Sequence, residues 1–317
     1  MEIWFTGETK LNNGLTVGAL VELEGQTVAG GQIDDTIMYI KGNFGELQVG
    51  DTDDVRIQKS VTGPEASEVF QVDHRTYETL SFSNNPLTQL TSYGNNVAGV
   101  NTTLEMVEAA SSKLIYLSPS FGGFSFGVSY APDATADRQN NGGLTEADND
   151  AGQNSEALSI AASYEGKWQN TGILASVGFT DSNNEDTTMD DVRAWQAGLN
   201  LDFGAFVVGG SYGRLENGLG NDLDVDTYAI SGTYKTGRYK VGLGWSHGNY
   251  EVTSTREPEL DTLLLSASYA MGPGVTLDAA IQHDRYDNDG TGAIGVGLGA
   301  TDDYDSTAIM VGSMISF

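Results

Sequence analysis

Segments in which apolar and polar side chains alternate with a period of two recur along almost the whole chain. Residues 124–130 read FSFGVSY, so that aromatic and branched side chains share one face while serine and glycine share the other. A soluble β-sandwich needs a dense branched core, and the second face here is too small and polar to form one. A water-filled interior suits it better. The same pattern predicts strands over residues 15–24, 158–164, 173–179, 195–203, 228–234, 239–245, 263–269 and 275–281.

The connections between these segments alternate in length. The short ones are rich in Gly, Asn and Pro, as tight turns require, and cover residues 11–14, 43–46, 121–123, 167–172, 203–205, 236–238 and 271–274. The long polar ones cover residues 25–34, 52–112, 132–154, 181–191, 215–224, 251–260 and 284–305. Brief turns on one side and long loops on the other are typical of transmembrane β-barrels.

The strand count is about fifteen, whereas closure of an up-and-down antiparallel barrel needs an even number. No export signal precedes Met1. We therefore expect a sixteen-stranded barrel whose first strand and signal peptide are missing. The alternative is one further strand within residues 55–112.

Composition narrows the class of protein further. The chain of 317 residues has no cysteine, which excludes disulfides and thiolate sites. It has no run of about 18 apolar residues, which excludes a transmembrane helix. A net charge of −29 argues against nucleic acid as a partner. The acidic stretches fall in the long connections, where they either keep loops soluble or form a mouth that attracts cations, including divalent ions bridging lipopolysaccharide.

The final residues, 307–317, alternate to the last position and end on Phe317. This ending resembles the C-terminal strand of bacterial outer-membrane β-barrels. Residues 2–25 (EIWFTGETKLNNGLTVGALVELEG) and 34–54 (DDTIMYIKGNFGELQVGDTDD), with the ending VGSMISF, resemble the general diffusion porins of α-proteobacteria. The resemblance implies an all-β, antiparallel up-and-down barrel of the sixteen-stranded type. It also implies a homotrimer in the outer membrane of a Gram-negative bacterium, and a long loop after the fifth strand that narrows the pore.

The longest connection, residues 52–112, has the position of that constriction loop within a single barrel domain of residues 1–317. Opposing charges at a constriction set up a transverse field that selects ions. Taken singly, each charge is as readily an ordinary solvated residue, but as a set their placement favours a pore constriction with weak cation preference. The candidates are Arg56, Lys59, Asp73, Arg75 and Glu78 on the loop and Glu8, Glu22 and Lys41 on the early strands.

Catalytic and metal sites are poorly supported. The histidines are His74, His247 and His283, and His283 adjoins Asp284, but neighbours on a strand point to opposite faces and cannot form a dyad. Asp287 and Asp289 match the start of a calcium-binding EF-hand loop, yet its twelfth position would be Leu298 instead of glutamate. We expect no enzyme activity and no cofactor, with adventitious calcium binding as a weak alternative.

The leading hypothesis is a passive water-filled channel for small hydrophilic solutes and ions, in contact with outer-membrane lipid and lipopolysaccharide. The alternative is an outer-membrane barrel with a blocked lumen and a structural or adhesive role. A soluble β-solenoid or sandwich is disfavoured by the aromatic-ended apolar face and the terminal strand.

Overall fold

A computed structural model gives the fold of the chain. It describes residues 2–24, 33–67, 69–72, 102–103, 111–133, 154–186, 188–251, 254–255, 257–287 and 304–315. Within these ranges, no helix combines the length and the apolar character needed to span a membrane.

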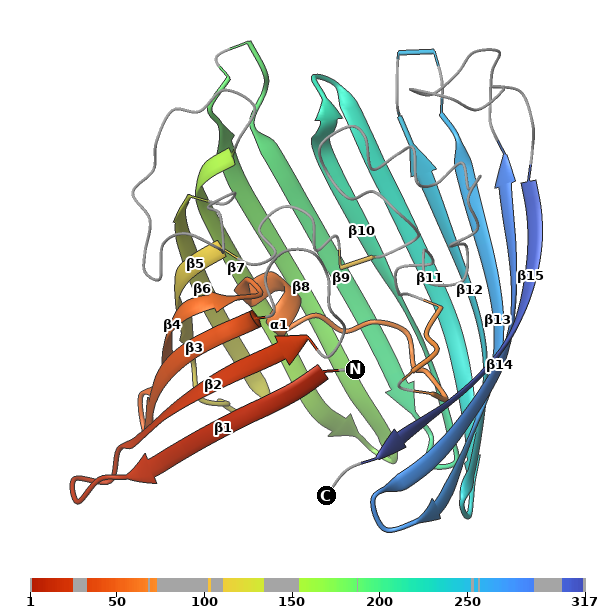
Figure 1. The fold of residues 1–317 in the computed structure, drawn as a ribbon, viewed down its shortest axis with the longest axis horizontal. Helices are drawn as coiled ribbons and strands as arrows, with labels where there is room; N and C mark the ends of the chain where they lie inside the picture. Colours follow the sequence, from red (N-terminus) through yellow and green to blue (C-terminus); the bar gives the residue numbers. More distant parts are fainter. Residues whose placement is uncertain are drawn as a thin grey trace. The chain divides into compact units, whose positions relative to one another are not determined.

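The described residues form a single sheet of 15 strands, in which each strand is hydrogen-bonded to its neighbours in sequence. Every pairing with an assigned register is antiparallel. Strands β10 to β15, teal to dark blue in Figure 1, lie side by side in chain order. The strands are β1 (Glu2–Lys10), β2 (Thr16–Glu24), β3 (Ile33–Gly42), β4 (Gly45–Thr52), β5 (Ser111–Leu117), β6 (Phe124–Asp133), β7 (Asn154–Trp168), β8 (Thr171–Asn184), β9 (Val192–Asp202), β10 (Phe206–Gly220), β11 (Leu223–Thr236), β12 (Tyr239–Tyr250), β13 (Glu259–Gly272), β14 (Val275–Asp287) and β15 (Tyr304–Ile315).

The predicted alternation is confirmed by the exposure of the side chains. On β6, Phe124 and Phe126 are 62% and 49% exposed, whereas Ser129 is buried. On β14, His283 is exposed and the adjacent Asp284 is buried, so the two side chains take opposite faces as predicted. Ring pairs on neighbouring strands close to the short turns, such as Phe124 with Tyr164 and Tyr239 with Tyr269, mark one end of the apolar face.

The strands are longer than the alternation predicted, mainly on the side of the long connections. Strand β7 begins at Asn154 instead of residue 158, β12 continues to Tyr250 instead of residue 245, and β14 continues to Asp287 instead of residue 281. Backbone pairing does not need apolar side chains, so the ladder extends into polar sequence where neighbouring strands still offer partners.

The polar face is less uniform than predicted, because small apolar clusters lie on it, and the two larger ones include a side chain of the segment that follows β4. One contains Val55, Ile115 and Ala161, and the other contains Val72, Leu264 and Ala280. In each cluster the segment that follows β4 supplies one of the side chains. The apolar side chains that the strands place on this face are thus buried by contact with apolar side chains of the segment.

Candidate functional site

The segment after β4 begins with one turn of helix, α1 (Val55–Gln58), which lies against β5 and β6. Asp54 is its N-cap: the backbone is extended, and the carboxylate Oδ1 accepts a hydrogen bond of 2.8 Å from the amide of Ile57. Such a cap satisfies an amide at the helix start that has no partner within the helix. The backbone carbonyl of Thr52 just before it accepts a hydrogen bond from the buried Lys113 of β5.

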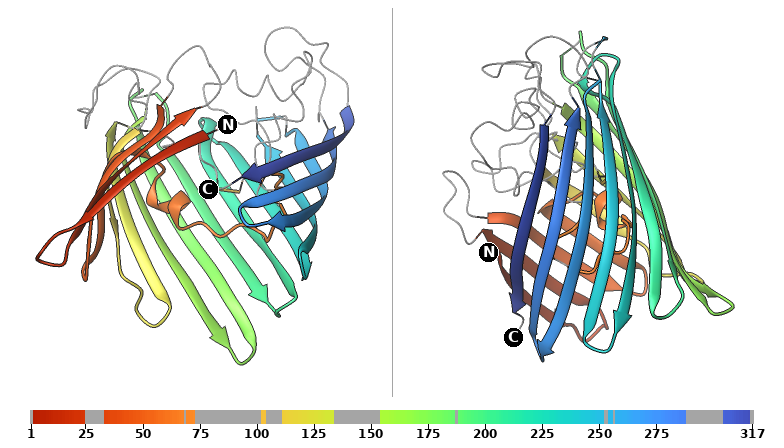
Figure 2. Two further views of the ribbon diagram at one scale, coloured as in Figure 1. Left: turned by 60° about the horizontal axis from the view of Figure 1, so that its bottom comes forward. Right: turned by 90° about the vertical axis from the view of Figure 1, so that its right-hand side faces the viewer.

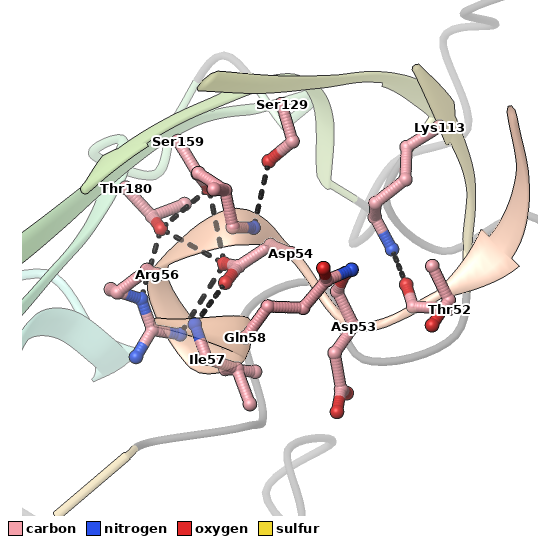
Figure 3. Close-up of polar contacts among 11 residues, drawn as sticks. Thr52, Asp53, Asp54, Arg56, Ile57, Gln58, Lys113, Ser129, Ser159 and Thr180 are labelled. Atoms are coloured by element: carbon pink, nitrogen blue, oxygen red, sulfur yellow. Dashed lines mark hydrogen bonds and ion pairs between the residues drawn. The ribbon is translucent and has the colours of Figure 1, made fainter. Parts of the chain in front are cut away.

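The other carboxylate oxygen of Asp54 binds this turn to the polar face of the sheet (Figure 3). Its Oδ2 accepts hydrogen bonds of 3.0 Å from the hydroxyls of both Ser159 and Thr180, and lies 3.5 Å from the guanidinium of Arg56. Arg56 Nε donates to Thr180 Oγ1 at 3.0 Å. All four side chains are completely buried, so each charge is compensated inside the protein.

Strands β6 and β8 carry small residues where they contact the turn. The amide of Val55 donates to Ser129 Oγ at 3.1 Å. A Cβ on Gly127 would lie 2.3 Å from Val55 Cγ2, and one on Gly178 would lie 2.6 Å from Arg56 Cγ. Because glycine has no Cβ at these two positions, the helical turn can pack closely against the strands.

The following segment, residues 61–72, lies along the same kind of surface on β9 to β15. In Figure 2 its orange trace follows one face of these strands. Polar side chains of the sheet donate hydrogen bonds to four of its backbone carbonyls, at 2.8–3.2 Å: Gln196 to Val61, Asn200 to Thr62, Ser231 to Pro64 and Ser246 to Val72. Main-chain carbonyls as the acceptors hold the path of the segment without depending on its side chains.

Glycines again mark the closest approach. A Cβ on Gly198 would lie 1.6 Å from the carbonyl oxygen of Val61, and one on Gly244 would lie 2.7 Å from Val72 Cγ1. The segment is also braced internally, because Glu65 Oε1 accepts from the amide of Val72 at 3.0 Å. Phe70 packs on the cluster of Val72, Leu264 and Ala280.

The early strands carry a polar network on one face. The Tyr39 hydroxyl donates to Glu8 at 3.1 Å, and the Lys41 ammonium lies 4.1 Å from the centre of the Tyr39 ring. Lys41 also lies 3.6 Å from Glu46, which accepts from Gln48 at 3.0 Å. Gln48 in turn accepts from Gln58 Nε2 at 3.1 Å, which connects the network to the end of α1.

The structure thus brings Glu8 and Lys41 together through Tyr39. Glu22 is buried on β2 opposite Trp4, and the register places it on the face of Glu8. Lys59 is half-buried and donates to Ser125 Oγ at 2.8 Å. Arg56, predicted to line the site, is instead completely buried as part of the anchor, because its guanidinium is held by Asp54 and Thr180.

The remaining candidates lie elsewhere. Asp73, Arg75, Glu78 and Asp289 fall outside the described residues. Asp287 ends β14 and lies 3.7 Å from Arg285, with both side chains well exposed. The part of the chain that the structure describes contains no group of three acidic, histidine or cysteine side chains placed to hold a metal.

Sequence reasoning missed the anchoring residues, Asp54 above all. One local signal was present, since an aspartate directly before the short run VRIQ is a typical N-cap. Its wall partners carry no signal, because serine and threonine are common on every polar strand face of this chain.

Comparison with known proteins agrees with this architecture. Residues 1–289 match the sequence profile of the Gram-negative porins. Among curated protein sequences, nothing matched. Solved structures with the same fold include an anion-selective porin from Comamonas acidovorans, at 16% identity and a TM-score of 0.66, covering 100% of this chain and 89% of that one.

Two further structures show the same likeness. One is OmpT of Vibrio cholerae in a trimer form, at 16% identity and a TM-score of 0.59, covering 99% of this chain and 88% of that one. The other is a mutant of the Rh. blastica porin, at 17% identity and a TM-score of 0.52, covering 100% and 89%. At these identities the likeness shows the fold, that of the sixteen-stranded porins, while the sequence profile covers most of the chain. The chain belongs to the Gram-negative porin family, the non-enzymatic channels of the outer membrane.

Proposed function

We propose that this porin is a water-filled channel with weak cation preference, through which small hydrophilic solutes and ions diffuse passively. The observation that carries the proposal is the segment of residues 53–72, which is held on the polar face by the buried Asp54–Arg56 anchor and by the hydrogen bonds to its carbonyls. A segment that is fixed on that face narrows the lumen of the barrel and leaves the lumen open. In this proposal residues 52–112 are the constriction loop of one barrel domain of residues 1–317.

The ion preference follows from the charges on this face. The early strands present Glu8, Glu22 and Glu46 against Lys41, and the loop adds Lys59 and Glu65. Because Arg56 is buried against Asp54, it contributes little field to the solvent. With a net charge of −29 on the chain, the balance favours cations. The anion selectivity of the Comamonas porin does not carry over, since the likeness at 16% identity concerns the fold.

The assignment to the general diffusion porins of α-proteobacteria rests on a resemblance in sequence. The strands at residues 2–25 and 34–54 are similar to those of α-proteobacterial general diffusion porins. We propose that the working form is a homotrimer, as in the trimer form of Vibrio cholerae OmpT. Its partners in the membrane are then lipid and lipopolysaccharide.

Single-channel recording of the detergent-purified protein in a planar bilayer with a salt gradient tests the proposal. We expect stepwise insertions in groups of three, ohmic open pores and a reversal potential on the cation side. A reversal potential on the anion side contradicts the cation preference. Absence of conductance from folded, heat-modifiable protein favours the blocked barrel with a structural or adhesive role.

The Lys41→Glu variant should raise the ratio of cation to anion permeability. The change removes a positive charge and adds a negative one beside Glu46. For a site in contact with water we expect roughly a two- to fivefold increase, since a unit charge at 4 Å contributes about 1 kcal/mol in water. Reversal potentials measure the ratio. Lys167→Glu, at an exposed position beside a short turn, is the matched control and should change it much less; an equal response would remove Lys41 from the constriction.

The selectivity should also depend on pH through Lys59. Burial lowers the pKa of the Lys59 ammonium below its ordinary value of 10.5. As the pH rises through that lowered pKa the positive charge is lost, so cation preference should increase before ordinary lysines titrate. The Lys59→Met variant should show the higher preference already at neutral pH, and Lys59→Arg should show no step. Reversal potentials across the alkaline range check this, and an identical step in Lys59→Arg would assign the titration to another group.

A further inference from the structure

Positive charge gathers at the short turn that joins β11 to β12. Lys235, Arg238 and Lys240 all lie within residues 235–240, although the chain as a whole has a net charge of −29. The turn itself consists of Gly237 and Arg238, and Gly237 has a φ of +57°, a left-handed conformation that glycine adopts without strain. This end of the hairpin is therefore basic in a strongly acidic protein.

Both lysines lie on the polar face of the sheet. On β11, Lys235 continues the alternation of Ser231 and Thr233, which are buried on that face. On β12, Lys240 continues the alternation that includes Gly242. Because side chains alternate with a period of two along a strand, both ammonium groups belong to the face that carries the constriction segment.

The register places Lys235 directly opposite Lys240, and we call these two residues the lysine pair. Directly opposed side chains have Cβ atoms about 4.5–5.5 Å apart, and like charges in such a pair are destabilising. Lys235 is exposed and Lys240 is half-buried. Within the described parts of the chain, neither ammonium has a hydrogen bond or an ion pair. An anion between the two ammonium groups would remove this repulsion.

The next carboxylate along the same row does not neutralise the pair. Ser268 lies opposite Lys240, and Asp278 lies opposite Ser268, so that Asp278 is two strands away, about 9–10 Å between backbones. The Asp278 side chain is itself buried. Arg238 donates a hydrogen bond of 3.1 Å to the carbonyl of Met271 and adds a further positive charge at the turn.

The lysine pair lies close to the place where residues 61–72 are held. The Ser231 hydroxyl donates to the carbonyl of Pro64 at 2.8 Å, and a Cβ on Gly242 would lie 3.0 Å from Ala66 Cβ. Gly242 is two residues from Lys240, on the side away from the short turn. A solute that passes this segment toward the short turns would therefore meet the two ammonium groups next.

Two adjacent ammonium groups suit a multivalent oxyanion. A phosphate group carries a charge of about −1.5 to −2 and has three acceptor oxygens, so it can accept hydrogen bonds from both lysines. A phospholipid would approach from the opposite face, where the rings of Tyr234 and Tyr239 are exposed. Because the lysine pair lies on the polar face, a solute in the lumen fits it better than a lipid headgroup does.

We propose that Lys235 and Lys240 bind the phosphate group of small anionic solutes at the short-turn end of the lumen. The proposal rests on the proposed function in that it takes the polar face as the wall of a water-filled channel. It adds a class of solute, since the net charge of the chain alone would disfavour phosphorylated compounds. The lysine pair offsets that repulsion locally.

The test compares three double variants of the detergent-purified full chain. Lys235→Gln/Lys240→Gln removes the lysine pair, and Lys235→Arg/Lys240→Arg keeps both charges. Lys10→Gln/Lys167→Gln is the matched control, because it removes two exposed lysines close to other short turns, on β1 and β7, with the same change in net charge.

Binding of inorganic phosphate is measured by the broadening of its phosphorus NMR signal at constant ionic strength. The measurement is made at about pH 8, where phosphate is mostly a dianion and lysine is charged. Binding of phosphatidylglycerol is followed by native mass spectrometry. Single-channel conductance in potassium chloride is recorded in parallel for each variant.

We expect the glutamine variant to bind phosphate about tenfold more weakly, since each lost attraction in water, screened by salt, is worth roughly threefold. The arginine variant and the control should bind phosphate as the unmodified protein does. Equal weakening in the glutamine variant and the control, or no weakening in either, would overturn the proposal. A glutamine variant that loses phosphatidylglycerol and keeps inorganic phosphate would assign the pair to a lipid headgroup and overturn it as well.

The channel and the phosphate site can fail separately. Absence of conductance in the unmodified protein, with phosphate binding still dependent on the lysine pair, would refute the proposed channel and leave the phosphate site standing. Normal conductance with no phosphate binding by the unmodified protein would refute the site and leave the channel.

Discussion

The Asp54→Asn variant is expected to release the start of the constriction loop and to make the channel wider and noisier. Asparagine remains a good N-cap, so the change isolates the charge of Asp54 from its capping role. The completely buried guanidinium of Arg56 would then lose its ion pair with the carboxylate of Asp54. Removing one partner of a buried ion pair costs about 3–5 kcal/mol, which is enough to unseat a segment of one helical turn. Single-channel recording should show higher mean conductance and larger current fluctuations, and hydrogen exchange should increase in residues 54–60.

Two further variants test whether loss of the ion pair, and not a general loss of stability, causes this effect. Asp53→Asn changes the neighbouring carboxylate, which is only half-buried, and should leave the conductance nearly unchanged. The double variant Asp54→Asn/Arg56→Met removes both charges, and replacing a buried pair with apolar groups is often close to neutral. The double variant should therefore restore most of the lower conductance and the smaller current fluctuations of the unmodified channel. Equal noise in the single and double variants would show that the ion pair is not what holds the turn.

The Gly198→Ala variant is expected to displace the next part of the loop. A methyl group at this position would lie 1.6 Å from the carbonyl oxygen of Val61, a backbone atom that cannot rotate away. The residues on either side along the same face, Gln196 and Asn200, donate to Val61 and Thr62 and would lose those hydrogen bonds as the segment moves. Overpacking and two lost hydrogen bonds together cost about 2–5 kcal/mol. Conductance and hydrogen exchange of residues 61–66 should change together.

Gly7→Ala is the control for this prediction. Gly7 also lies within a strand, and a methyl group added there would meet nothing within 4 Å. The same substitution in open space should leave the conductance as it is. If Gly198→Ala behaved like Gly7→Ala, the close approach of residues 61–72 to β9 would be refuted.

The two predictions show what the sequence could reveal of this site. The capping signal at Asp54 is local, because the cap and the amide of Ile57 are three residues apart. The anchor is not local: Thr180 is 126 residues away from Asp54 and Ser159 is 105 away. Arg56 was therefore predicted as a solvent-lining charge, since only the position of β7 and β8 makes it a buried one.

The strands and their faces were determined by the sequence itself. A side-chain period of two depends on backbone geometry alone, so serine against phenylalanine on β6 indicates both the strand and the face before any neighbour is known. The short turns follow in the same way from glycine, asparagine and proline. Family resemblance at residues 2–25 and 34–54 added the porin class, which the match over residues 1–289 confirms.

Only the tertiary structure decided where the segment of residues 53–72 lies and which wall residues hold it. Its sequence has no period of its own, and its hydrogen bonds run through main-chain carbonyls that every residue type possesses. The polar network of the early strands likewise arises from register, because Glu8 and Tyr39 become neighbours only when β1, β2 and β3 pair with a particular offset. Periodicity is a property of one strand, whereas these sites depend on the alignment of several strands.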